Sequence, residues 1–443
     1  MRGPHSLQCF TFEHITTKRH SHGHDYKLET QVAGKTDAHK GISPLLTCHT
    51  CFFFRNSSRT CSAPRHCDIA RLTPDHHGET MSLNLSKIGF GTWQFGSAGA
   101  EDYWGVEFTQ NMATEFVKEA VSSGITYFDT AEDYSGGRSE MQLGVALKAL
   151  SPEDRAKCIV GSKILPNHCS YDDVRKYVDG TLDRLGIDAI DLMMIHWPIS
   201  KAGMAHFAGD HKNAAGGRDY AAVDVDSISQ VPSTELALKA LGELQAEGKI
   251  KHVGVSNFGK NQLEQAMKFG VKIAVNQVCL NFLFRAVEFE ILPFCVANDI
   301  QVIAYSPLMQ GLCLGRWSRT DDVPIYRART RHFNSANPGS KSRHEEPGHE
   351  KLLFETIDRV RSISEKHGIA MIDLSLAYPL HKVGVSCVVA GATKMVHVGG
   401  NAQAGATQLT EEVMKELDEA TDALKQAMGG NADLWQGADS RIN

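Results

Sequence analysis

The sequence alternates between short apolar runs typical of β-strands and longer segments with helical periodicity. Eight strand-like runs recur between residues 88 and 393, among them CIVGSKI (158–164) and QVIAYSPL (301–308). In the intervening segment 233–248, apolar residues recur at a spacing close to 3.6. Strands that alternate with helices are parallel and are joined by crossovers. The sequence therefore predicts an α/β fold, a single (β/α)8 TIM barrel with long loops on its C-terminal face.

The composition of the chain changes near residue 68. Residues 1–67 carry eight of the 21 histidines and five of the eleven cysteines, with little periodicity. We interpret them as a disordered extension or as sequence upstream of a start at Met81. Two further alternatives stay open: an organellar targeting segment, or a zinc site built on Cys48, Cys51, Cys61 and Cys67. We expect the barrel domain to span 68–435 and a tail to follow at 436–443. Within the barrel domain, residues 68–72 and 83–88 are predicted to pair as an N-terminal β-hairpin.

Charge and hydropathy exclude several classes of protein. The formal net charge of −6 gives no electrostatic reason to expect nucleic acid as a partner. No apolar run approaches the roughly eighteen residues that a membrane-spanning helix needs, and the amino terminus lacks the pattern of a secretory signal. We therefore expect a soluble, cytoplasmic protein whose cysteines are thiols.

Four polar residues stand at the downstream ends of three strand-like runs: Asp129, Tyr134, Lys163 and His196. The carboxyl ends of successive parallel strands converge on one mouth of a barrel, so these side chains should meet there. A phenol beside an ammonium, a carboxylate and an imidazole can deliver a proton to a carbonyl oxygen. The pattern predicts an enzyme that acts on small carbonyl compounds or alcohols.

Several sequence blocks resemble those of the aldo-keto reductases. FDTAEDY (128–134), GSK (161–163) and IHWP (195–198) occur in the order typical of that family, and GVSNF (254–258) and YSPL (305–308) follow. The resemblance implies an eight-stranded barrel that binds NADP(H) in extended form and reduces aldehydes and ketones.

The resemblance also implies roles for the four polar residues. It makes Tyr134 the general acid, Lys163 and Asp129 the groups that adjust its pKa, and His196 the residue that orients the substrate carbonyl. Because a nearby ammonium favours the phenolate, we expect Lys163 to lower the pKa of Tyr134.

The cofactor residues that the resemblance implies come from all around the mouth, and no metal is expected. Ser256, Asn257 and Gln277 match a clamp for the nicotinamide carboxamide, and Tyr305 matches the aromatic residue that stacks on the nicotinamide ring. The full set is Thr92, Trp93, Asp129, Ser256, Asn257, Gln277, Tyr305, Ser306, Leu308, Gln310, Arg316, Arg329, Gly391, Thr393, His397 and Asn401. Arg327 and Arg331 are as plausible as Arg329 for contact with phosphate. His397 and Gly400 replace residues common in the family, which leaves the strength of NADP preference open.

Two rival interpretations remain at this point. The chain also resembles the regulatory β subunits of potassium channels, although those carry Asn where His196 stands. A sugar or pyridoxal dehydrogenase that works in the oxidative direction is the other alternative. The identity of the substrate depends on loops 198–232 and 309–350 and on the end of the chain after residue 429, whose shapes the sequence does not determine. The sequence also leaves the oligomeric state open.

Overall fold

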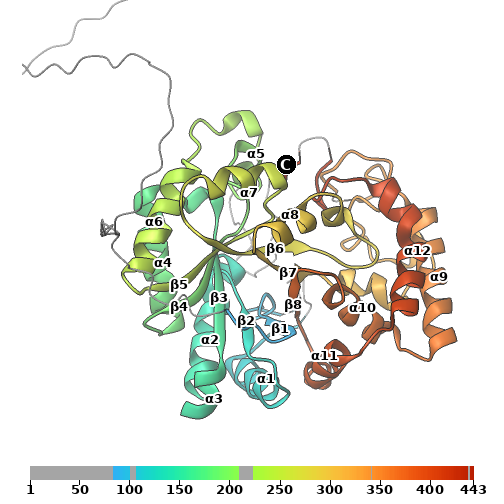
Figure 1. The fold of residues 1–443 in the computed structure, drawn as a ribbon, viewed down its shortest axis with the longest axis horizontal. Coiled ribbons are helices and arrows are strands. Elements are labelled where there is room, and N and C mark those ends of the chain that lie inside the picture. The colour runs from blue at the N-terminus through green and yellow to red at the C-terminus, as the bar shows by residue number, and fades with distance from the viewer. Residues whose placement is uncertain (1–82, 100–105, 209–222, 341, 438–439) are drawn as a thin grey trace, which may run out of the picture. The chain divides into compact units, whose positions relative to one another are not determined.

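The structure, a computed structural model, describes residues 83–99, 106–208, 223–340, 342–437 and 440–443 (Figure 1). Eight parallel strands close into a barrel in sequence order, β1 pairing with both β2 and β8. The strands are β1 (Ile88–Gly91), β2 (Tyr127–Asp129), β3 (Ile159–Ile164), β4 (Ile190–Ile195), β5 (Ile250–Ser256), β6 (Ile273–Cys279), β7 (Gln301–Tyr305) and β8 (Val385–Ala390). The predicted (β/α)8 barrel is confirmed.

Helices lie around the outside of the strands, as Figure 1 shows. They are α1 (Gln110–Ser122), α2 (Arg138–Lys148), α3 (Pro152–Lys157), α4 (Tyr171–Leu185), α5 (Lys201–Ala205), α6 (Thr234–Ala246), α7 (Lys260–Met267), α8 (Ile291–Ala297), α9 (Glu350–His367), α10 (Met371–Leu380), α11 (Val396–Ala406) and α12 (Glu411–Met428). Among the described residues, no helix is long and apolar enough to cross a membrane.

Local sequence signals explain where these helices begin and end. The side chain of Ser170 accepts a hydrogen bond from the backbone N–H of Asp173 at the start of α4, and Thr410 caps α12 in the same way. Gly186 ends α4 in the left-handed conformation that glycine adopts without strain. These two signals delimit α4 at residues 171 and 185.

A tyrosine fills the barrel interior and supports the carboxyl end of β2. Tyr127 is fully buried, and its hydroxyl donates to Asp129 Oδ2 at 3.1 Å. A Cβ atom at Gly161 would lie 2.4 Å from the Tyr127 oxygen, and one at Gly89 would lie 2.5 Å from its ring. The neighbouring strands β1 and β3 must therefore carry glycine at these points, because any larger residue would clash with the ring.

The predicted strand at 83–88 is wrong over most of its length. Residues 83–87 are irregular, strand β1 begins only at Ile88, and the proposed partner strand at 68–72 lies outside the described residues. Leu83 packs against the apolar residues inside the barrel, and its carbonyl accepts from Gln301 Nε2. The Ser86 hydroxyl accepts from the backbone N–H groups of Thr126 and Tyr127 at 3.1 Å each. Apolar burial thus holds this segment against the barrel without strand pairing.

The two long loops and the chain end are partly described. Loop 198–232 contains α5, and its residues 209–222 lie outside the described part, as does the cysteine-rich region 1–67. Residues 440–443, which we assigned to a tail, pack on the barrel: Arg441 and Ile442 are buried, and the Asn443 carbonyl accepts from the backbone N–H of Gln262.

Glu288 joins three basic side chains beside α10 and α12, which predicts a measurable loss of stability in acid. Its carboxylate contacts Arg285 at 2.7 Å, Lys425 at 3.0 Å and Lys382 at 3.3 Å. Burial by itself raises the pKa of Glu288, but Arg285 and the two lysines outweigh it and lower the pKa from 4.5 to about 2. Such a carboxylate stabilises the fold above pH 4.5, and its contribution, about 3 kcal/mol, is lost as the pH falls towards 2.

Glu288→Gln should therefore lower the free energy of unfolding at pH 7 and weaken its dependence on pH between 4.5 and 2. Urea unfolding at pH 7, 4 and 3 measures both effects. Asp299→Asn is the control, because Asp299 is 91% exposed in its contact with Lys272 and should contribute little. Equal stability losses in the two variants would contradict the assignment.

Candidate active site

The four predicted catalytic residues meet at the carboxyl ends of β2, β3 and β4. Asp129 ends β2, Lys163 lies in β3, and His196 directly follows β4. Tyr134 begins a short 3-10 helix (Tyr134–Gly137) just after β2. Lys163 Nζ donates to Asp129 Oδ1 at 2.6 Å and to the Tyr134 hydroxyl at 3.3 Å, and the Tyr134 and His196 rings meet edge to face with centroids 5.7 Å apart.

Asp129 has hydrogen bonds on both carboxylate oxygens. Oδ1 accepts from Lys163, whereas Oδ2 accepts from the Tyr127 hydroxyl and from Gln277 Nε2 at 2.7 Å. Lys163 also donates to the Thr130 carbonyl at 2.8 Å. The buried ion pair is thus held in one geometry, as a buried pair of charges requires.

Two opposing effects act on the pKa of Tyr134. Burial raises the pKa of Tyr134 to about 12, although Lys163 acts to lower it, and the carboxylates of Asp129 and Asp133 raise it further. Lys163 therefore acts on the pKa of Tyr134 in the expected direction, but the net shift is upward, since desolvation of the phenolate outweighs the nearby ammonium. Burial also acts to lower the pKa of Lys163, but Asp129 and Tyr134 raise it above its usual value, so the lysine is a cation at neutral pH.

Asp133 is a member of the site that the sequence reasoning did not single out. One of its carboxylate oxygens lies 3.5 Å from His196 Nδ1. Its position next to Tyr134 in FDTAEDY was the available signal. The backbone around His196 is fixed as well, because its N–H donates to the Ile164 carbonyl at 2.8 Å and its carbonyl accepts from Asn257 Nδ2 at 3.1 Å.

A cavity of about 570 Å³ opens over these residues. Most of the predicted residues line it: Trp93, Asp129, Tyr134, His196, Ser256, Asn257, Gln277, Tyr305, Ser306, Leu308, Gln310, Arg316, Arg329, Gly391, Thr393 and His397. Among the described residues that we predicted for the site, Lys163, Thr92 and Asn401 do not line the cavity. Thr92 is fully buried and donates to the Asp129 carbonyl at 3.0 Å, and Asn401 is buried on α11.

The polar residues of the predicted nicotinamide clamp are bonded to one another. Ser256 Oγ donates to the Gln277 carbonyl, and the Tyr305 hydroxyl donates to Asn257 Oδ1 at 2.8 Å. Asn257 also donates to Ser256 Oγ at 3.1 Å. The network holds these side chains in fixed positions along the cavity.

The residues present fit a dinucleotide at this cavity. Asn257, Ser306, Met309 and Gln310 all line it with a positive φ, a backbone conformation that non-glycine residues adopt at a cost and that gathers at binding sites. Within the described chain, Gln310 Oε1 is buried without a hydrogen-bond partner. Arg316, Arg327 and Arg329 supply guanidinium groups suited to phosphate.

The end of the chain also reaches the cavity, as expected, although the sequence analysis named no individual residue there. Trp435 and Arg441 line the wall together with Trp197, His206 and Phe207. The Trp435 ring is parallel to the Tyr305 ring within 5°, with centroids 6.2 Å apart. Trp197 lies in the IHWP block, whereas no local pattern in the sequence marks Trp435 or Arg441 for the site.

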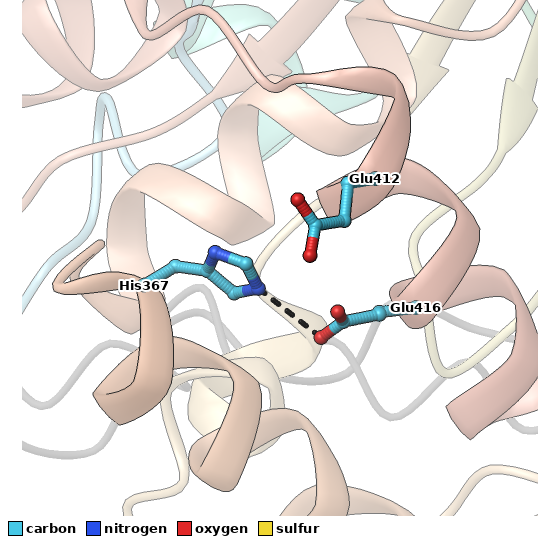
Figure 2. A group of neighbouring side chains, drawn as sticks. All are labelled: His367, Glu412 and Glu416. Atoms are coloured by element: carbon cyan, nitrogen blue, oxygen red, sulfur yellow. Dashed lines mark hydrogen bonds and ion pairs between the residues drawn. The ribbon is translucent and has the colours of Figure 1, made fainter.

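One group of possible metal ligands lies outside the cavity, between α9 and α12. Figure 2 shows His367 facing Glu416, whose carboxylate lies 3.1 Å from Nε2, with Glu412 one turn away. Lys366 contacts Glu416 at 2.5 Å and Glu412 at 3.7 Å, and its hydrogen bond is the main cause that lowers the pKa of Glu416. Since a lysine already neutralises these carboxylates, we read the group as an ion-pair network that joins the two helices.

Comparison with known proteins places this geometry in a family. Residues 87–422 match the model of the aldo/keto reductase family. The NADH-specific methylglyoxal reductase of Escherichia coli (strain K12) is 28% identical over 366 residues, which are 77% of this chain and 98% of that protein. The aldo-keto reductase YhdN of Bacillus subtilis (strain 168) is 24% identical over 347 residues, covering 76% and 90% of the two chains.

Comparison with solved structures supports the same family. The glycerol dehydrogenase of Gluconobacter oxydans is 25% identical, with a TM-score of 0.56, and the match covers 76% of this chain and 91% of that one. A thermostable aldo-keto reductase in complex with epalrestat is 26% identical, with a TM-score of 0.53 and coverage of 76% and 95%. The chain therefore belongs to the aldo/keto reductase family of oxidoreductases.

Proposed function

We propose that this protein transfers hydride between NADP(H) and an aldehyde or ketone, or the matching alcohol, with Tyr134 as general acid and base. The observation that carries the proposal is the contact of Lys163 Nζ with both Asp129 and the Tyr134 hydroxyl, beside a cavity that His196 also lines. Family membership supports a nicotinamide cofactor.

The residues of the site match the needs of carbonyl reduction. A bound nicotinamide supplies the hydride, and negative charge then grows on the carbonyl oxygen of the substrate. Tyr134 and His196 can stabilise that oxygen, and Tyr134 can give it a proton. A phenol with a pKa of about 12 is protonated at neutral pH, which suits it to donate in the reductive direction.

A screen of small carbonyl compounds tests the proposal. The loss of reduced-cofactor absorbance is followed with NADPH and with NADH, and methylglyoxal belongs in the panel because the Escherichia coli relative is named for it. We expect turnover with at least one aldehyde or ketone. Failure of the whole panel, in both directions and with both cofactors, would refute the assignment.

Arg316, Arg327 and Arg329, which all line the cavity, support a preference for NADPH. Arg316 and Arg327 both lie over the Trp317 ring, at 5.6 and 5.9 Å, and Arg327 donates to the Gln310 carbonyl at 2.6 Å. Guanidinium groups bind phosphate in a fixed, bidentate geometry. Because the Escherichia coli relative is named NADH-specific, we propose only a modest margin in favour of NADPH.

Arg316→Ala should weaken NADPH binding by about 10- to 100-fold, the range expected when a charged hydrogen bond is lost, and should leave NADH nearly unchanged. Arg329→Ala is the parallel test. Quenching of tryptophan fluorescence gives Kd for both cofactors. Arg319→Ala is the control, since Arg319 is exposed, contacts Asp322 and is not part of the cavity wall. Equal or tighter binding of NADH by the wild-type protein would show the phosphate-site assignment to be wrong.

A further inference from the structure

Arg441 has an unusual setting for a charged side chain. Its side chain is fully buried, and its guanidinium lies over the Trp197 ring, 3.5 Å from the centroid. Nε and Nη2 donate to the two carboxylate oxygens of Asp433 at 2.7 and 2.8 Å. The aromatic face and the bidentate pair together fix the plane of the guanidinium.

Asp433 connects this arginine to a second cavity residue. Its Oδ1 also accepts from the backbone N–H of Trp435 at 3.1 Å, and its Oδ2 accepts from the backbone N–H of Arg441 at 3.3 Å. From the other side, Gln262 Nε2 donates to the Arg441 carbonyl at 2.9 Å. Each oxygen of the Asp433 carboxylate therefore accepts two hydrogen bonds, and the carboxylate positions both Trp435 and Arg441 at the cavity wall.

One nitrogen of this arrangement remains unused. Arg441 Nη1, directed away from Asp433 by the pairing of Nε and Nη2, is buried with no hydrogen-bond partner in the described part of the chain. An unpaired buried donor is costly, and a buried ion pair is weak evidence for stability. The arrangement is poorly explained by stability alone, whereas an acceptor atom on a bound substrate would satisfy Nη1.

The surroundings indicate what kind of acceptor fits. Trp197 follows His196 in the chain, so Arg441 stands next to the catalytic end of the cavity. Asp433 balances the charge of Arg441, and burial, together with Arg441 and Arg343, keeps the pKa of His206 well below its usual value, so that this imidazole is neutral. A neutral dyad among aromatic rings offers an N–H group without a strong net charge, which favours a neutral oxygen over a carboxylate.

We propose that Arg441 is a substrate-binding residue whose Nη1 donates to a hydroxyl oxygen of the substrate, so that the enzyme selects hydroxylated aldehydes or ketones over hydrocarbon ones. This inference rests on the proposed carbonyl-reducing function. It assigns a specificity role to a residue that none of the sequence blocks contains.

Matched substrates test the inference. Hydroxyaldehydes of two to four carbons are compared with the aldehydes in which a methyl group replaces the hydroxyl, and kcat/KM is measured for each pair. The wild-type enzyme should prefer the hydroxyl member of at least one pair. Arg441→Lys keeps a cation beside Asp433 but removes Nη1, and it should reduce that preference by about 10-fold or more, as expected when a polar contact to a substrate hydroxyl is lost. The kcat/KM for the methyl member should fall by a smaller factor than that for the hydroxyl member.

Arg331→Lys is the matched control. Arg331 is also buried, contacts Glu346 and donates to the Met428 and Asn431 carbonyls, but it does not line the cavity. It should cost stability without changing the substrate preference. An unchanged preference in Arg441→Lys, or an equal change in both variants, overturns the inference.

Two further measurements separate the possible failures. If Arg441→Lys impairs the use of succinic semialdehyde instead of the hydroxyaldehydes, the acceptor is a carboxylate and the proposed neutral oxygen is wrong. If the wild-type protein turns over no carbonyl compound, the proposed function fails, and fluorescence titration with dihydroxyacetone and pentan-3-one still tests the inference without turnover. Equal binding of these two ligands by the wild-type protein would overturn it.

Discussion

Tyr134→Phe should lower kcat for carbonyl reduction by at least about a hundredfold, in line with the contribution of a general acid. The substitution keeps the aromatic ring at the cavity wall and removes only the hydroxyl that accepts from Lys163 at 3.3 Å. Binding of NADPH should persist, because the ring still packs beside His196 and the cofactor residues are untouched. Steady-state kinetics together with a fluorescence measurement of cofactor Kd distinguishes lost chemistry from lost binding.

Tyr171→Phe provides the comparison. The Tyr171 hydroxyl donates to Glu243 on the outside of the barrel, and the residue does not line the cavity. This variant should retain wild-type kcat. Near wild-type turnover in Tyr134→Phe would show that another group donates the proton.

Lys163→Met should affect both stability and chemistry. Removal of the lysine leaves Asp129 buried beside Tyr127 and Gln277 without its cation, which is expected to cost about 3–5 kcal/mol. The double variant Asp129→Asn/Lys163→Met removes both charges and should recover part of that loss. Urea unfolding of the two variants and the wild-type protein measures the difference, and equal stability of all three would contradict a tightly coupled pair.

The single variant Lys163→Met should also change how the rate of alcohol oxidation depends on pH. Burial already holds the pKa of Tyr134 at about 12 while Lys163 acts to lower it, so loss of the lysine raises the pKa further. Oxidation needs the phenolate, and its rate should rise with pH in the wild-type enzyme. In Lys163→Met the rise should begin at a higher pH. At any pH below that point, the variant should oxidise the alcohol more slowly than the wild-type enzyme. An identical profile in the two proteins would rule out Lys163 as the group that adjusts Tyr134.

The barrel and the grouping of the four candidate catalytic residues were predictable because they depend on short-range features. Alternating apolar runs and helical periodicity gave the strands and helices, and polar caps such as Ser170 gave helix boundaries. Residues at the carboxyl ends of parallel strands meet by topology alone, so Asp129, Lys163 and His196 could be placed together before any contact was known.

Other properties depended on contacts between distant parts of the chain. The pKa of Tyr134 follows from how completely the fold desolvates it, which no spacing of residues encodes. Leu83 and Leu85 alternate with polar residues as they would in a strand, yet Leu83 is held by packing against the barrel interior instead. In both cases burial in three dimensions outweighed the local signal.

The sequence by itself therefore determined the barrel, the family and the chemistry of the strand ends, because local patterning and the pairing order of parallel strands suffice for them. Only the tertiary structure brought Arg441 onto Trp197 and Trp435 opposite Tyr305, contacts between segments more than a hundred residues apart. Such contacts form because the chain end buries its apolar and paired charged groups against the mouth of the barrel. The stability of these contacts comes from packing and from the removal of apolar surface from water. Neither effect produces a periodic pattern in the sequence.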